Sequence, residues 1–221
     1  MMLRNKQIVK GLVIFIELMV VAYIVTADIA VATLLLLFLV FVSLRTRKQK
    51  FSLLRLRKFK NFKTDIPKIF ALTVAWTAFT LGVVAPVLSH LFGLQQDTAA
   101  YASLEGNVPQ MLGLLALTWT LVVFGEEIIY RSFIPLRVSE LFSTYRRKYL
   151  LALLLSSVLF GLAHSELGWA GMIIAFSNGI YYSLVKHYFD DNLWASVLSH
   201  GFSNTIGIVG FFLIGPVSSF W

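Results

Sequence analysis

The chain has 221 residues, of which 58% are hydrophobic and 14% charged, and its mean hydropathy is +0.79. A soluble domain usually has about 45–50% apolar and about 25% charged residues, so both values indicate an integral membrane protein. They exclude a disordered, a collagen-like and a disulfide-rich secreted chain. The sequence has no cysteine, which excludes disulfides, thiolate metal sites and cysteine nucleophiles. We expect a single membrane domain over residues 1–221.

Long apolar runs follow one another along the chain, and a helix needs about 20 such residues to cross a bilayer. The runs predict an all-α, polytopic transmembrane bundle of about seven spans, because helices satisfy their own backbone groups in lipid. The predicted spans cover residues 8–26, 28–44, 66–92, 109–135, 149–164, 168–186 and 193–214.

The charges predict the orientation of these spans. Of the 19 basic residues, 18 fall in the N-terminal tail and in the loops on its side of the membrane. The opposite loops carry Asp28, Asp97, Glu105 and Glu166 and no Lys or Arg. The positive-inside rule therefore predicts a multi-pass cell-membrane protein with a cytoplasmic N-terminus and an outer C-terminus. The net charge of +8 then reflects cytoplasmic loops beside the lipid bilayer, and we expect no nucleic-acid partner.

Two segments near the start of the chain allow alternatives. Residues 1–27, which end in Val25-Thr26-Ala27, resemble a cleavable signal peptide. We expect them to be retained, because Glu17 interrupts the apolar run and a second span follows almost at once. Residues 45–63 interleave basic and apolar side chains. They could form an interfacial helix on anionic lipid, but a positive-inside loop is the favoured interpretation.

Ionisable groups inside spans are candidates for function because their burial in lipid is costly. Glu127 and Arg131 are four residues apart with the acid first, so they can neutralise each other on one helix face. Glu126 points about 100° away around the helix and has no such partner. It is therefore the carboxylate left for general acid or base chemistry, although a purely structural ion-pair cluster would also explain these residues.

Two further spans carry histidine at helical spacing. Phe160 and His164 share a face near the end of one span, and His200 and Asn204 share a face of the last. Two chemistries suit this set. Glu126, His164 and His200 could hold a catalytic divalent metal such as zinc. Alternatively, Glu126 and His164 activate a water while His200 and Asn204 stabilise an oxyanion. The presence of Asn204 slightly favours the second chemistry. Both chemistries predict amide hydrolysis without a covalent nucleophile.

The three motifs Glu126-Glu127-x-x-x-Arg131, Phe160-x-x-x-His164 and His200-x-x-x-Asn204 occur in the order found in a known family. The sequence resembles the CPBP (Abi, CAAX-protease-like) intramembrane proteases over residues 109–214, with residues 1–108 as family-variable spans and an external loop. The resemblance implies a water-filled cavity within the last four spans. It implies that Glu126 and His164 activate water, that His200 and Asn204 form the oxyanion site, and that Glu127 and Arg131 support them. Many bacterial members are regarded as metalloproteases, and some confer bacteriocin immunity.

The sequence thus predicts an intramembrane endopeptidase acting on a peptide or membrane-protein substrate. The alternative is a non-proteolytic immunity or signalling-partner protein that keeps the same fold. Three points remain open at this stage. Glu17 could be protonated or could face another chain, and Asn178 could line the cavity, although a bond between helices is favoured. The expected depths of the candidate catalytic residues in the membrane also disagree. Measured along the helices, Glu126 lies about 16 Å from the inner boundary near Arg137, whereas His164 lies about 24 Å from Lys148.

Overall fold

The computed structural model describes residues 2–27 and 31–216, which form helices joined by short loops, with no strand among them. Residues 28–30, where the second predicted span begins and where Asp28 lies, are outside the described residues. The helices are α1 (Met2–Thr26), α2 (Ala32–Thr46), α3 (Phe62–Phe79), α4 (Ala85–Phe92), α5 (Val108–Leu117), α6 (Val123–Glu126), α7 (Ile134–Leu141), α8 (Lys148–Leu162), α9 (Gly168–Tyr188) and α10 (Leu193–Ile214).

Several of these helices join into longer rods. A π-helical turn links α3 to α4, and two more link α5, α6 and α7, so that 62–92 and 108–141 are each continuous. Within the described residues, 7–26, 62–92, 108–141 and 193–214 are each long and apolar enough to cross a membrane. Helices α8 and α9 qualify together as a pair bent by 60°, which gives four candidate spans, or five with that pair.

The prediction of an all-helical membrane protein is therefore confirmed, whereas the number of seven spans stays a prediction. Helix α2 has 15 residues, or about 22 Å of helix, against a hydrocarbon core of about 30 Å. Some helix boundaries also differ from the predicted ones. The span expected over 109–135 continues to Leu141, and residues 45–63 hold one short 3₁₀ turn, Phe51–Leu54, as the loop interpretation implies.

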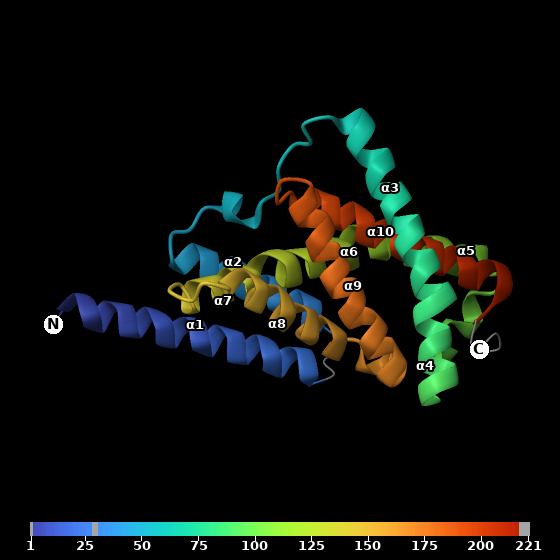
Figure 1. Cartoon of the computed structure of the whole chain (residues 1–221), viewed down its shortest axis with the longest axis horizontal. Coiled ribbons are helices and arrows are strands. Elements are labelled where there is room, and N and C mark those ends of the chain that lie inside the picture. The colour runs from blue at the N-terminus through green and yellow to red at the C-terminus, as the bar shows by residue number, and fades with distance from the viewer. Residues whose placement is uncertain (1, 28–30, 217–221) are drawn as a thin grey trace.

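The helices pack as a bundle around the 108–141 rod (Figure 1). Helix α1 lies at one margin against α7 and α8, and α3 lies at the other against α10. Residues of the rod, including Val123, Phe133 and Ile134, are buried with Leu36 of α2 and Leu193 of α10 in one core. In the window of each candidate span only 17–33% of residues are buried, which fits helices whose outer faces contact lipid.

The loops collect at two ends of the bundle, as the charge pattern requires. At one end, the Asp97 amide donates to the Leu167 carbonyl and the Gly106 amide to the Phe212 carbonyl. At the other end, the Leu193 amide donates to the Arg55 carbonyl. The loops 93–107 and 163–168 form the first end, which we call the acidic end. The loops 45–61 and 189–192 form the second, which we call the basic end.

Glu17 is paired within the chain, with two arginines and a serine from α2 and α7. Its carboxylate lies 3.0 Å from Arg47 and 3.1 Å from the fully buried Arg137, and it accepts a hydrogen bond from Ser43. Sequence reasoning missed these partners because they come from α2 and α7, far along the chain. The contacts tie α1 to the rest of the bundle, and loss of α1 would leave the Arg137 guanidinium buried with less compensation.

Gly161 permits the close approach of α8 and α9 that places His164. A Cβ atom on Gly161 would lie 2.8 Å from the Met172 carbonyl oxygen and 3.1 Å from Phe176 Cβ, so the helices would have to separate. We expect Gly161→Ala to lower the free energy of unfolding by about 1–3 kcal/mol. Gly113→Ala is the matched control, since nothing lies within 4 Å of its Cβ position. Equal thermal unfolding of both variants in detergent would contradict this expectation.

Candidate active site

A cavity of 350 Å³ lies between α5–α6, the end of α8, α9 and α10. Its lining includes all four residues expected to carry chemistry: Glu126, His164, His200 and Asn204. They come from three separate parts of the sequence, and the fold brings them to one polar space inside apolar helices. The acidic end forms its rim, through Gln96 and Tyr101 from one loop and Glu166 and Leu167 from the other.

The depth disagreement is resolved by where the helices really begin and end. Because the 108–141 rod continues to Leu141, Glu126 lies about 22 Å from its inner end, close to the 24 Å of His164 along α8. Helix α10 begins inside the protein, since Leu193 is completely buried. His200, seven residues along α10, lies 3.8 Å from Glu126 across the cavity.

His200 is held by Glu127. Its Nδ1 donates to Glu127 Oε1 at 2.9 Å, and Glu127 Oε2 lies 3.4 Å from Arg131 Nε. All three side chains are buried. The Tyr182 ring stacks on the His200 ring at 4.7 Å, which fixes the plane of the imidazole. Glu127 and Arg131 thus form the ion pair expected from their spacing, and Glu127 also orients a cavity histidine.

Glu126 is the carboxylate that pairs with no Lys or Arg among the described residues. Its Oε2 atom is buried, has no hydrogen-bond partner among the described residues, and lies 3.8 Å from His200 Nε2. A cluster that served packing alone would satisfy such an oxygen, because an unpaired buried polar atom costs free energy. Glu126 instead faces the cavity, where a water or substrate atom can reach it.

His164 presents one nitrogen to the cavity. Its Nδ1 lies 2.8 Å from the Phe160 carbonyl oxygen, which can only accept, so Nδ1 carries the proton. The neutral ring then has a free lone pair on Nε2. This explains the i, i+4 spacing of Phe160 and His164, since the backbone of one sets the tautomer of the other.

Several cavity residues gave no usable signal in the sequence. Tyr101, from the rim loop, stacks on Phe211 at 5.0 Å. Burial, together with the carboxylates of Glu166 and Glu126, raises the pKa of Tyr101, so its hydroxyl stays protonated at neutral pH. Tyr101 stands in a polar loop, where nothing in its sequence neighbourhood marks it. Tyr182, by contrast, is a polar ring in an apolar helix, a weak sign of a buried role.

Asn178 combines the two roles that the sequence left open. Its side-chain oxygen accepts a hydrogen bond of 2.7 Å from Trp76 Nε1, which joins α9 to α3. It also lines the cavity. Ser199, beside His200 in the sequence, points instead to Thr73 at 2.7 Å. Ser199 does not line the cavity.

The candidate metal ligands do not converge in this arrangement. In the part of the chain that the structure describes, no group of three His, Asp or Glu side chains is placed to hold a metal ion. Nδ1 of each cavity histidine is already engaged, His164 with a carbonyl and His200 with Glu127. Glu126, His164 and His200 thus do not form a ready zinc site in this geometry, and a metal stays an untested prediction.

A polar cavity that brings carboxylates and histidines together among apolar helices is a candidate active site. Residues 108–206 match the family model described as type II CAAX prenyl endopeptidase Rce1-like. This segment is therefore similar to that family of intramembrane proteases, as the three motifs indicated. No match was found among curated proteins or among solved structures.

Proposed function

We propose that the protein is an intramembrane endopeptidase that hydrolyses a peptide bond by direct attack of water. The observation that carries this proposal is the cavity shared by Glu126, His164, His200 and Asn204. The match of residues 108–206 to a family model of intramembrane proteases supports it further. The unsatisfied Glu126 oxygen supports it further, since a water between the carboxylate and its neighbours would complete the hydrogen bonding.

In the proposed reaction Glu126 takes a proton from the water, with His164 Nε2 as the second acceptor that aligns it. The water oxygen attacks the peptide carbonyl carbon, and the carbonyl oxygen becomes an oxyanion. The proton then passes to the peptide nitrogen as the carbon–nitrogen bond breaks. The products are a free carboxylate and a free amine, and no covalent enzyme intermediate is needed.

His200 and the Asn204 amide form the proposed oxyanion site. Because His200 donates its Nδ1 proton to Glu127, its Nε2 can donate only when the ring is doubly protonated. The Glu127 carboxylate, 2.9 Å from His200 Nδ1, holds the imidazole in place, as in the histidine–carboxylate arrangement of other hydrolases. Glu127 and Arg131 thereby act as positioning residues behind the site.

The proposed topology has seven crossings, with a cytoplasmic N-terminus and an outer C-terminus. It places the basic end in the cytoplasm and the acidic end outside. The rim residues of the cavity, such as Tyr101 and Glu166, then lie toward the outer surface. The substrate bond accordingly enters from the outer half of the membrane, which favours an exported or membrane-spanning peptide over a prenylated cytosolic terminus.

The proposal is tested by comparing newly formed peptide termini in membranes and medium from cells with wild-type protein or Glu126→Gln at matched levels. Glu105→Gln is the control, because Glu105 is an exposed carboxylate outside the cavity. We expect termini that appear with wild type and Glu105→Gln and are absent with Glu126→Gln. Identical profiles for all three, with any phenotype retained by Glu126→Gln, would refute catalysis and favour a non-proteolytic immunity or partner protein.

A further inference from the structure

A second large cavity, of 730 Å³, opens at the basic end of the molecule. It is built from the first turns of α1, the segment around Leu53, helix α7, the loop before α8 and the last turn of α9. It shares no lining residue with the catalytic cavity. Its volume falls in the range of sites for small molecules.

The lining of this basic cavity is strongly cationic. It has five basic and two acidic residues, which are Lys10, Arg55, Arg131, Lys148, Lys186, Glu140 and Asp191. Glu140 is engaged with Arg137 at 3.1 Å, whereas Asp191 lies 3.5 Å from His187 and also acts electrostatically on Lys186. Arg131 is already paired with Glu127 at 3.4 Å, so the remaining excess of positive charge comes from Arg55 and the three lysines, and an anion bound there would compensate it.

Arg55 and Lys186 are the two cations best placed to hold an anion. Among the described residues, neither side chain has an ion pair or hydrogen bond. The Arg55 backbone is anchored, since its carbonyl accepts from the Leu193 amide at 2.9 Å. Lys186 stands in the last turn of α9, where its side chain is partly buried. The segments that bear them are therefore fixed before any ligand binds.

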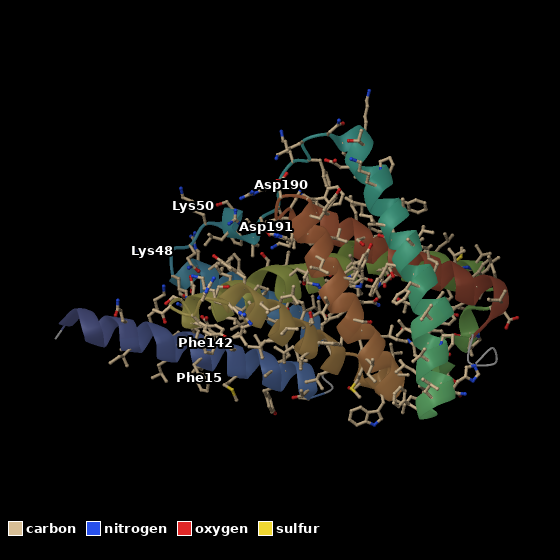
Figure 2. The ribbon with its side chains drawn as sticks, in the orientation of Figure 1. Phe15, Lys48, Lys50, Phe142, Asp190 and Asp191 are labelled. Carbon is tan, nitrogen blue, oxygen red and sulfur yellow. The ribbon has the colours of Figure 1, made fainter. Side chains whose placement is uncertain are left out.

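Apolar side chains border the same cavity. Ile14 and Leu136 line it, and Tyr149 on its edge is 71% exposed. Nearby, Phe15 on α1 and Phe142 at the end of α7 are 52% and 40% exposed, on two helices that pack together (Figure 2). A ligand at this site would thus place an anionic group among cations and an apolar portion along exposed membrane-facing side chains.

We propose that this basic cavity binds an anionic phospholipid, with the headgroup phosphate between Arg55 and Lys186 and the acyl chains along α1 and α7. A free inorganic phosphate would satisfy the cations but leave the apolar border uncovered. The site also lies directly behind the catalytic residues, because Arg131 lines it and pairs with Glu127, which holds His200. The inference does not depend on the protein being a protease.

The test uses the purified full-length chain in detergent and titrates dioctanoyl phosphatidylglycerol, with complexes counted by native mass spectrometry. We expect saturable binding that weakens by about tenfold or more in Arg55→Gln/Lys186→Gln, because both charge-assisted contacts to the phosphate are lost. Lys48→Gln/Lys50→Gln is the matched control. It removes the same charge from the loop after α2, outside the cavity (Figure 2), and should bind within about twofold of wild type.

Three results would overturn the proposal. The first is equal weakening by both double variants, which would indicate diffuse surface charge. The second is equal affinity for dioctanoyl phosphatidylcholine, whose phosphate is neutralised within the headgroup. The third is displacement of the lipid by inorganic phosphate but not by chloride at the same ionic strength, which would assign the cavity to a soluble anion. Arg55→Gln alone, at an exposed position, serves if the Lys186 change impairs folding.

Discussion

Glu126→Gln is expected to cut the rate of peptide-bond cleavage by about 100-fold or more, because a positioned general base contributes about 10²–10⁴ to such reactions. Glutamine keeps the size and shape of the side chain but cannot take a proton from water. The substitution also breaks no salt bridge to Lys or Arg, so folding should be little affected. The measurement is single-turnover cleavage of a substrate found by its wild-type-dependent termini, alongside thermal unfolding of the same preparation.

Glu105→Gln is again the control for this experiment and should cleave within about twofold of wild type, as expected for a surface change. The experiment measures the cleavage rate and the thermal stability of each variant separately. A Glu126→Gln protein that unfolds at the wild-type temperature but cleaves at an undiminished rate would remove Glu126 from the mechanism. His164 would then have to activate the water alone.

Glu127→Ala, one residue further along, is expected to have a different effect and to lower the free energy of unfolding by about 3–5 kcal/mol. The change would leave the Arg131 guanidinium buried without its carboxylate and remove the acceptor of His200 Nδ1. Arg131 would retain its contact with the Phe160 ring, 4.0 Å from the guanidinium carbon, which compensates only in part. Unfolding in detergent and the level of protein in membranes would both report the loss.

The companion variant Glu127→Leu/Arg131→Leu separates charge from packing. Replacing both members of a buried ion pair by apolar side chains is often tolerated far better than removing one. We therefore expect the double variant to be more stable than Glu127→Ala, yet poorly active, because His200 loses its orienting carboxylate. A double variant as unstable as Glu127→Ala would show that the ion pair itself is indispensable for folding.

The helical class, the approximate spans and the motif residues could be predicted from the sequence because they depend on local properties. Apolar runs of membrane length force helix formation, and i, i+4 spacing places Glu127 beside Arg131 on any helix. The same spacing put the Phe160 carbonyl within reach of His164. The surplus carboxylate Glu126 followed from the same geometry, since it had no basic partner one turn away.

Only the tertiary structure decided which groups meet across helices. The partners of Glu17 are residues 30 and 120 positions later, and no local pattern links them. His200 meets Glu126 because α10 packs against the 108–141 rod, which no local pattern in the sequence predicts. Tyr101 joined the cavity because its loop returns over the acidic end. Local spacing fixes which face of a helix a residue occupies, whereas distance between helices is set by long-range packing that the sequence does not display.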